Sequence, residues 1–337
     1  MTKVLVTGGA GYIGSHMCVE LLQADYDVVV VDNLSNSSRG SLARVQNITQ
    51  KSLEFVQADL RDADAVSKLF GAHELSAVLH FAGLKAVGES VSQPMRYYDN
   101  NVNGTLRLLE AMQTADVKTL VFSSSATVYG VPQQMPITEV FPTNPINPYG
   151  KTKLHIEEML KDLYASDPDW RISLLRYFNP VGAHACGEIG EHPNGVPNNL
   201  LPYISQVAVG KLAKLKVFGD DYPTPDGTGI RDYIHVTDLV RGHLHALAFL
   251  QDTPKLAIHN LGTGKGCSVF DVLKAFEGAT GKTIPYEIVG RRAGDAAESY
   301  ADPGKAHREL DWAAEYDIER MCADAWRWQS RYPDGYG

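Results

Sequence analysis

The sequence of 337 residues predicts an α/β fold built on a doubly wound parallel sheet, and three observations support this. Short β-branched runs without polar interruption alternate with stretches of helical length and periodicity. A glycine-rich turn follows the first of these runs. After about residue 178 the composition shifts toward Gly, Pro and Asn in long segments. We therefore expect a large sheet covered by helices on both faces, followed by a smaller, mixed C-terminal lobe that binds substrate.

The predicted elements follow in order along the chain. Apolar runs typical of buried strands are Lys3–Thr7, Val28–Val31, Leu53–Ala58, Ala77–Phe81, Thr119–Ser123 and Ile172–Leu175. Helical patterns are Tyr12–Ala24, Tyr149–Tyr164, Val236–Leu250, Ser268–Thr280 and Ile318–Gln329. The segments Gly182–Asn199 and Asp220–Gly229 have the composition of ordered loops, which in compact proteins are usually functional. We expect residues 1–178 to form the sheet domain and residues 179–337 the smaller lobe, with strands and helices interleaving between them.

Composition and charge exclude several classes of function. Lys and Arg number 31 against 40 Asp and Glu, a net charge of −9, which gives no electrostatic footprint for nucleic acid or for an anionic membrane. The longest apolar runs are far short of the roughly 20 residues that span a bilayer, and the first residues resemble a strand, not a signal peptide. No C-x-x-C pair occurs among Cys18, Cys186, Cys267 and Cys322, which argues against a zinc site or a disulfide scaffold. We expect a soluble, cytoplasmic protein with reduced thiols and no metal.

The turn Gly8–Gly14 directly follows the first predicted strand and opens the first helix. Its glycines at positions 8, 11 and 14 permit a tight turn, a close approach of the backbone to a pyrophosphate, and close packing of helix on strand. The helix N-terminus directs free N–H groups at the anion. This is the pattern of a Rossmann-type dinucleotide site, although the same glycines could also serve a tight turn without a ligand.

Acidic and apolar residues at the ends of the next strands strengthen the prediction. Asp32 ends the second strand, where its carboxylate can accept hydrogen bonds from the adenosine ribose and repel a 2′-phosphate, which favours NAD over NADP. Asp59 follows the third strand and Phe81–Gly83 the fourth. The carboxyl ends of parallel strands meet at one edge of the sheet, where open α/β sheets bind their ligands.

A second group of residues indicates proton chemistry at the same edge. Tyr149 and Lys153 are four apart on one helix face, and the hydroxyl cluster Ser123–Thr127 ends the fifth strand. A tyrosine near pKa 10 needs a shift of about three units to act as a base near pH 7, and one cation at roughly 5 Å supplies about 3 kcal/mol. With Lys153 and a positive nicotinamide ring beside it, Tyr149 can take a hydroxyl proton while Ser125 hydrogen-bonds the reacting oxygen. A surface Tyr–Lys pair without function is the alternative.

These motifs resemble the extended short-chain dehydrogenase/reductase family, and longer strings resemble its UDP-hexose 4-epimerases over nearly the whole chain, from Thr2 to the region of Trp326–Gln329. The strings are His80–Ser90, Tyr98–Val102, Ser123–Gly130, Leu175–Ala183 and Gly229–Val236.

The resemblance implies three sets of site residues. The implied catalytic residues are Ser125, Tyr149 and Lys153. The implied cofactor contacts, to a tightly held NAD, are Gly8, Gly11, Tyr12, Ile13, Gly14, Asp32, Asn33, Ser35, Asn36, Ser37, Asp59, Leu60, Phe81, Ala82, Lys85, Asn100, Ser123, Tyr149, Lys153 and Phe178. The implied contacts to the UDP-sugar are Ser125, Tyr149, Asn179, Asn199, Leu200, Lys216, Phe218, Arg231, Tyr233, Arg292, Asp295 and Ser299. Arg231 and Arg292 can fork onto a diphosphate, and Phe218 can face a uracil.

The expected activity is the interconversion of UDP-galactose and UDP-glucose by transient oxidation at carbon 4. A sugar-nucleotide 4,6-dehydratase or decarboxylase of the same fold is the alternative enzyme, but those relatives have an Asp-Glu pair beside the hydroxyl, whereas here Ala126–Val128 follows Ser125. A non-catalytic NAD-sensing module is the alternative from another class, and the intact Ser125, Tyr149 and Lys153 argue against it.

Two further expectations come from the resemblance. In the family, position 299 bounds the sugar pocket near carbon 2, and members confined to plain hexoses have tyrosine there. Ser299 therefore predicts that UDP-GlcNAc and UDP-GalNAc are accepted too. The alternative is that Tyr300 closes the same space. The family also implies a homodimer through helices near Tyr97–Ala115 and Tyr149–Tyr164. Apolar positions recur at helical spacing on these helices, a pattern that is more often plain core: Leu106, Leu109, Met112, Ile156, Met159 and Leu163.

Overall fold

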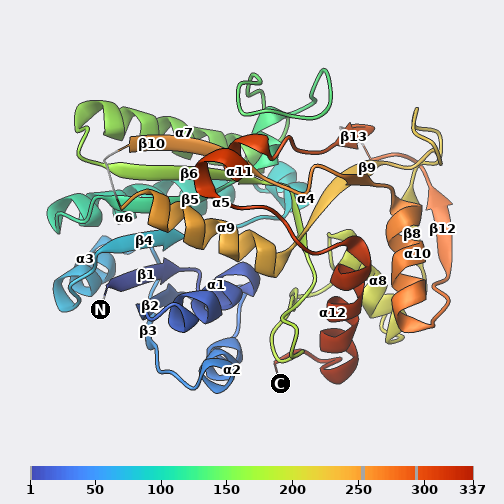
Figure 1. Ribbon diagram of the computed structural model, residues 1–337, viewed down its shortest axis with the longest axis horizontal. Coiled ribbons are helices and arrows are strands. Elements are labelled where there is room, and N and C mark those ends of the chain that lie inside the picture. Colours follow the sequence, from blue (N-terminus) through green and yellow to red (C-terminus); the bar gives the residue numbers. More distant parts are fainter. Residues whose placement is uncertain (1, 252–254, 293–294, 337) are drawn as a thin grey trace.

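The large sheet predicted from the sequence is present in the structure, a computed structural model that describes residues 2–251, 255–292 and 295–336. Seven parallel strands lie in the order β10-β6-β5-β4-β1-β2-β3 (Figure 1). Their bounds are β1 (Lys3–Thr7), β2 (Asp27–Asp32), β3 (Glu54–Gln57), β4 (Ala77–His80), β5 (Thr119–Ser125), β6 (Arg171–Tyr177) and β10 (Lys255–Leu261). The chain builds outward from β1 to β3 and then returns to β4 on the other side, so a crevice opens at the carboxyl ends of β1 and β4.

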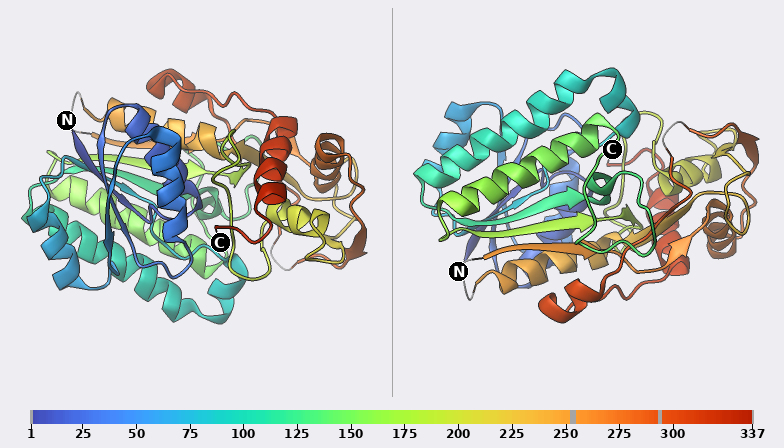
Figure 2. Two further views of the ribbon diagram at one scale, coloured as in Figure 1. Left: turned by 90° about the horizontal axis from the view of Figure 1, so that it is seen from below. Right: turned by 90° about the horizontal axis from the view of Figure 1, so that it is seen from above.

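Helices cover both faces of this sheet (Figure 2). One core cluster packs the sheet against α1 (Tyr12–Gln23), α2 (Arg39–Thr49), α9 (Val236–Phe249) and α11 (Gly304–Leu310). The other packs it against α3 (Ala63–Ala72), α6 (Gly104–Thr114) and α7 (Pro148–Ser166). Burial on both faces explains why the strands are apolar without alternation.

Several short helical segments lie near the carboxyl edge of the large sheet: α4 (Val87–Ser92), α5 (Pro94–Tyr97), the π-helical η1 (Tyr98–Asn103) and the 3-10 helix η2 (Ala126–Tyr129). The resemblance implied helices near Tyr97–Ala115, and the structure has there a π-helical turn followed by α6. Inside that turn Asn101 is buried and its amide bonds the backbone oxygen of Leu84 at 3.0 Å. A π-helical turn of this kind is common at functional sites.

The second half of the chain also contributes a strand to the large sheet, because β10 pairs with β6 and α9 and α11 pack beside it. The remaining C-terminal elements form a smaller body at the right of Figure 1. They are β7 (Asn179–Val181), α8 (Leu200–Ala208), β8 (Leu215–Phe218), β9 (Ile230–His235), β11 (Gly266–Cys267), α10 (Val269–Thr280), β12 (Tyr286–Val289), β13 (Glu298–Ser299) and α12 (Ile318–Arg331). The chain thus crosses between the two bodies more than once, and the proposed boundary after residue 178 stays a prediction.

Local sequence sets the beginning of two of these helices. Asn147 caps α7 by accepting a hydrogen bond from the Gly150 N–H at 2.8 Å, and Pro148 occupies the first helical position, where a missing N–H has no cost. Ser268 and Asp271 form a reciprocal capping box at the start of α10. None of the described helices is both long enough and apolar enough to cross a bilayer.

Candidate active site

The glycine turn between β1 and α1 is packed too closely for any larger side chain. Gly8 has a φ of +69°, and a Cβ there would lie 2.8 Å from the Ala82 nitrogen. A Cβ on Gly14 would collide with the carbonyl oxygen of Gly8. Gly11 is the N-cap of α1 and has no side chain to bond the N–H groups of the first turn, so these remain directed at the cavity. The turn therefore has the shape and the donors of an anion-binding site.

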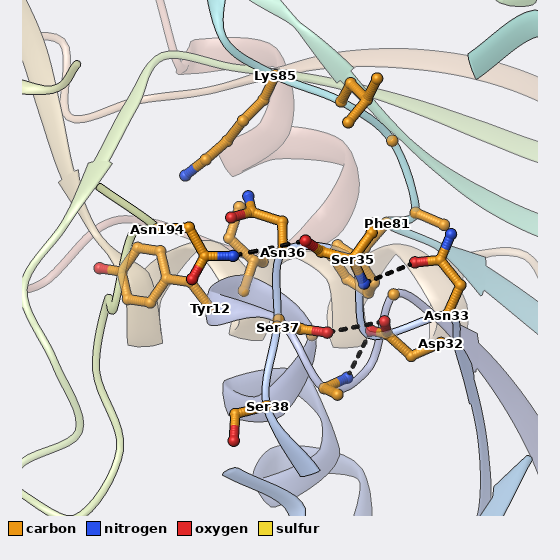
Figure 3. Close-up of a pocket in the computed structure, with 18 of the residues that line it drawn as sticks. Tyr12, Asp32, Asn33, Ser35, Asn36, Ser37, Ser38, Phe81, Lys85 and Asn194 are labelled. Carbon is orange, nitrogen blue, oxygen red and sulfur yellow. Dashed lines mark hydrogen bonds between the residues drawn. The ribbon is translucent and has the colours of Figure 1, made fainter. Parts of the chain in front are cut away.

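The Asp32 carboxylate at the end of β2 organises the neighbouring loop (Figure 3). Its Oδ2 accepts from the Ala10 N–H at 3.1 Å, and its Oδ1 accepts from the Leu34 N–H at 2.9 Å and the Ser37 hydroxyl at 2.8 Å. Next to it, Asn33 donates to Asp59 Oδ2 at 3.0 Å. The Arg61 guanidinium lowers the pKa of Asp59, which is therefore ionised at neutral pH. Two carboxylates thus lie at the strand ends where the sequence placed them.

These residues line one cavity of about 270 Å³ at the carboxyl edge of the large sheet. Most of the predicted cofactor contacts are among its lining: Gly8, Gly11, Tyr12, Ile13, Gly14, Asp32, Asn33, Ser35, Asn36, Ser37, Asp59, Leu60, Phe81, Ala82, Lys85, Asn100, Tyr149 and Lys153. The other two are buried elsewhere. The Ser123 hydroxyl bonds His243 Nε2 at 2.9 Å, and Phe178 packs in a small cluster with Tyr129.

The cavity has a further wall, whose residues were not among the predicted contacts although part of it belongs to the predicted loop Gly182–Asn199. It consists of Tyr177, of the segment Gly190–Asn194 and of Tyr336, near the C-terminus. Tyr177 ends β6 in register with Ser125, a position that the strand pattern could have indicated. The pairing of Gly190–Asn194 with Tyr336 had no sequence signal, because it joins two irregular segments far apart in the chain.

Two of the three predicted catalytic residues line this cavity, and the third, Ser125, is buried outside its lining. Tyr149 and Lys153 lie one turn apart on α7 and both line it, and the Lys153 ammonium lies 6.0 Å from the centre of the Tyr149 ring. The ammonium also donates to the Ser123 backbone oxygen at 2.8 Å, which fixes it against the end of β5. The Ser125 side chain, also buried, accepts from the Thr127 N–H at 3.2 Å.

Burial changes the protonation of both groups. Desolvation raises the pKa of Tyr149 to about 12, against a smaller lowering by a hydrogen bond with Ser125. Desolvation lowers the pKa of Lys153 to about 8, against a raising by the nearby Glu157 carboxylate. In the protein alone Tyr149 is therefore a neutral phenol at pH 7, and Lys153 is a cation close to its titration range.

A buried ion pair lies behind the catalytic helix. Arg176 Nη2 lies 2.6 Å from Glu157 Oε2, and its Nε donates to Oε1 at 2.9 Å. Glu157 also accepts from the Ser124 hydroxyl at 2.5 Å, and Arg176 donates to the Tyr129 hydroxyl at 3.1 Å. These bonds join α7, β5, β6 and η2 behind the site and satisfy two charges that would otherwise be costly to bury.

The residues predicted to contact a nucleotide-sugar lie mainly on β7, β8, β9 and β13. Asn179 follows β6 and pairs with Tyr233 of β9, which connects this group to the edge that carries Tyr177. Asn199 and Leu200 begin α8, while Lys216 is exposed on β8.

Two arginines and an aromatic ring of this group lie together, with Arg292 exposed and Arg231 and Phe218 half-buried. The Arg292 guanidinium lies 4.5 Å from the centre of the Phe218 ring, and its Nε donates to Asp295 Oδ2 at 3.2 Å. Arg231 Nη2 lies 3.7 Å from the other Asp295 oxygen. One carboxylate thus holds two forked cations beside an aromatic face, an arrangement that suits a diphosphate next to a flat base.

Ser299 and Tyr300 lie beside different neighbours. Ser299 on β13 pairs with Arg231, whereas Tyr300 reaches the Gly266 position on β11, where a Cβ would lie 3.2 Å from its ring. Gly266 in turn pairs with Asp232, the residue after Arg231. Tyr300 follows the last residue of β13, and its ring lies beside Gly266 of β11.

Comparisons with known proteins agree with this geometry. A family profile described as GDP-mannose 4,6 dehydratase matches residues 5–325. The UDP-glucose 4-epimerase of Bacillus subtilis is 60% identical over 333 residues, which are 99% of this chain and 98% of that protein. The UDP-glucose 4-epimerase of Homo sapiens is 56% identical over 342 residues, 99% of this chain and 98% of that one. This chain belongs to the UDP-glucose 4-epimerase family.

Solved structures of the epimerase family are similar throughout. The Bifidobacterium longum UDP-glucose 4-epimerase in complex with NAD+ and UDP has a TM-score of 0.96 at 52% identity, covering 99% of this chain and all of that one. The Stenotrophomonas maltophila UDP-glucose-4-epimerase with bound NAD and formylated UDP-arabinopyranose has a TM-score of 0.97 at 53% identity, covering 99% of both chains. The expected fold class and family resemblance are confirmed.

The cavity of this epimerase-family chain fits a dinucleotide on its own geometry. The close packing at Gly8 and Gly14 leaves backbone N–H groups, not side chains, facing the space where a pyrophosphate would lie. Asp32 presents a carboxylate at the end of the neighbouring strand, and Tyr149 and Lys153 of α7 line the same cavity.

Proposed function

We propose that this protein is an isomerase that interconverts UDP-galactose and UDP-glucose with a tightly held NAD. The observation that carries the proposal is the position of Tyr149 and Lys153 in the lining of the same cavity as the glycine turn. The full-length similarity to UDP-glucose 4-epimerases supports the choice of substrate.

NAD, when bound, supplies a group that can accept a hydride from carbon 4 and return it. The protein's own residues move the proton. Tyr149 takes the proton of the sugar hydroxyl, Lys153 stabilises the phenolate by its charge, and Ser125 hydrogen-bonds the oxygen that becomes a carbonyl. Because burial raises the pKa of Tyr149 to about 12, phenolate formation depends on positive charge close to the ring. The 4-keto sugar then turns over in the pocket, and Tyr149 returns the proton when the other face is reduced.

We assign nucleotide binding to the groups on β8 and β9. Arg231 and Arg292 would bind the diphosphate, and Phe218 would face the uracil, with Asp295 holding the two guanidinium groups in place. Asn179, Asn199, Leu200, Lys216 and Tyr233 complete the proposed set of contacts.

The test is an assay of UDP-galactose and UDP-glucose interconversion without added cofactor, together with analysis of what the purified protein carries. We expect turnover in both directions and NAD that is released on denaturation. A strict requirement for external NAD would contradict the proposal. Tyr149→Phe should abolish turnover while the bound NAD remains, and an unchanged rate would refute the role of Tyr149.

A dehydratase is the second candidate, because the matching profile carries a dehydratase description. Eliminating water needs an acid beside the reacting hydroxyl, but Ser125 is followed by Ala126, Thr127 and Val128, and Thr127 bonds Ser125 through its backbone N–H and its hydroxyl. Formation of a 4-keto-6-deoxy sugar, detected by its absorbance in base, would favour this candidate.

We further propose that UDP-GlcNAc and UDP-GalNAc are interconverted. Replacing a tyrosine ring by the hydroxymethyl group of Ser299 leaves space for an acetamido group, and the Tyr300 ring lies beside Gly266 of β11. Ser299→Tyr should abolish turnover of the N-acetyl sugars and spare the plain hexoses. A wild type inert toward both N-acetyl sugars would refute this proposal.

We propose a homodimer as the working state. Of the predicted apolar positions, Leu109, Met112 and Ile156 are buried inside the protomer, and Met159 and Leu163 are half-buried against the same core. Leu106 is exposed, however, and exposed apolar side chains also lie on α4 and α5, beside α7: Val87, Val91 and Met95. A patch of this kind suits a second copy. A monomer mass by light scattering at micromolar concentration would refute it.

We also propose a cytoplasmic location. The four cysteines are free thiols in the structure, the state expected in a reducing compartment.

A further inference from the structure

The segment Gly190–Asn194, which we call the strap, forms one wall of the dinucleotide cavity and is held by the end of the chain. All five of its residues line the cavity, and Tyr336 lines it beside them. The strap belongs to the long loop between β7 and α8, so it approaches the glycine turn from the opposite half of the sequence.

The Tyr336 phenol satisfies both backbone groups of Gly190. Its hydroxyl donates to the Gly190 oxygen at 2.9 Å and accepts from the Gly190 N–H at 3.2 Å. Burial raises the pKa of Tyr336 to about 12, so at neutral pH the phenol keeps the proton that it donates. Beside it, the Trp328 indole donates to the Glu191 backbone oxygen at 3.1 Å. The first two residues of the strap are thus bonded to the C-terminal region.

The strap is also bonded across the cavity to loops of the sheet domain. Lys85, which follows β4, lies with its ammonium 2.8 Å from the Glu191 carboxylate. Asn194 at the far end of the strap donates to the Ser35 backbone oxygen at 3.4 Å, next to the loop that Asp32 organises (Figure 3). The strap therefore spans from the Lys85 side of the cavity to the side that carries Asp32.

The C-terminal aromatic residues are themselves anchored on the sheet domain. The Arg44 guanidinium of α2 lies 3.8 Å from the Tyr332 ring centre, 5.1 Å from that of Tyr336 and 5.3 Å from that of Trp328. Such cation–π contacts favour a fixed placement of the rings. The phenol of Tyr336 is consequently held at the same place relative to α2 and to the cavity that α1 and β2 border.

We propose that Tyr336 is a latch that keeps the strap closed over the dinucleotide and so slows the release of NAD. This inference rests on the proposed function, in which the cofactor must stay bound between two hydride transfers. The strap can open and expose the cavity only when the hydrogen bonds of Gly190, Glu191 and Asn194 break. Without the phenol hydroxyl, both backbone groups of Gly190 lose their partner, so the open state becomes more populated.

The test compares Tyr336→Phe with Tyr332→Phe as its matched control. Both substitutions remove one phenol hydroxyl and keep the ring beside Arg44, but the Tyr332 hydroxyl bonds Glu188, outside the strap, at 2.7 Å. Each protein is loaded with radiolabelled NAD, and its loss is followed in excess unlabelled NAD. We expect release about tenfold faster for Tyr336→Phe, the size of an effect from one or two hydrogen bonds, and the wild-type rate for Tyr332→Phe.

Equal release from both variants and the wild type would overturn the latch, as would equal acceleration in the two variants. A second variant, Asn194→Ala, removes the hydrogen bond at the other end of the strap and should also speed the release of NAD. If this variant released NAD at the wild-type rate, closure by the strap would be contradicted. The melting temperature of each NAD-free variant is also measured, because a substitution that destabilises the fold would lower it. A wild type that carries no NAD would instead contradict the proposed function itself.

Discussion

Replacing Lys153 by methionine tests how Tyr149 becomes a base. Methionine keeps most of the side-chain volume and removes the charge, which lies 6.0 Å from the Tyr149 ring centre. In an environment with an effective dielectric near 20, one charge at about 6 Å stabilises the phenolate by about 3 kcal/mol, or about two pKa units. The rate at pH 7 should therefore fall by about 100-fold, because the fraction of phenolate falls by that factor.

The pH profile should change shape as well as height. Burial lowers the pKa of Lys153 to about 8, so its charge is present at pH 7 and is lost as the pH rises through about 8. The wild type should lose the help of this charge above pH 8. In Lys153→Met no such group titrates, so the rate should continue to rise with pH as Tyr149 ionises on its own.

The assay measures kcat for UDP-galactose between pH 6 and about pH 10, with bound NAD quantified in each preparation. Lys151→Met, at an exposed position on the same helix, is the matched control and should keep the wild-type profile. A Lys153→Met profile with the wild-type shape and only a lower rate would refute the electrostatic role. Lys153 would then serve to position NAD or, through its bond to Ser123, the end of β5.

Two further substitutions test the cavity and the buried ion pair. Gly14→Ala should abolish NAD retention, because the added Cβ would collide with the carbonyl oxygen of Gly8. The control Gly71→Ala has open space around its Cβ and should keep the wild-type content of NAD, measured as the NAD released on denaturation. Glu157→Gln should lower the free energy of unfolding, measured by urea denaturation, by about 3 kcal/mol, because it leaves Arg176 buried without a counter-charge. The control Glu158→Gln, at the exposed neighbouring position, should change the free energy of unfolding by less than about 0.5 kcal/mol.

Much of the sheet could be predicted because its strands are buried on both faces. The run Lys3–Thr7 matches β1 at both ends, and the predicted helix at Tyr12 begins at the same residue in the structure. Buried parallel strands need continuous apolar residues, so their sequence is distinctive. The glycine turn and Asp32 were predictable for a related reason, since their positions at the strand ends follow from the strand assignments.

The strand β10 shows why other parts could not be predicted. Its sequence ends in His259, Asn260 and Leu261, and two of these three are polar although all are buried. The polar side chains bond distant partners: His259 Nε2 lies 2.9 Å from Glu309, and Asn260 accepts from the Tyr129 hydroxyl at 2.7 Å. Such a strand lacks the apolar signal that marks burial. The bonds between Tyr336 and Gly190 were unpredictable for the same reason, because they depend on the folded arrangement and not on local sequence.

The placement of Arg176 explains how a lysine next to a carboxylate can still act on Tyr149. Glu157 is one helical turn from Lys153 and would be its natural partner on α7. In the structure both oxygens of Glu157 are instead engaged by Arg176. The ammonium of Lys153 is bonded instead to a neutral backbone oxygen. Its charge is therefore not bonded to a carboxylate and is available to the phenolate, while the nearby Glu157 carboxylate raises the pKa of Lys153 and so favours its charged form.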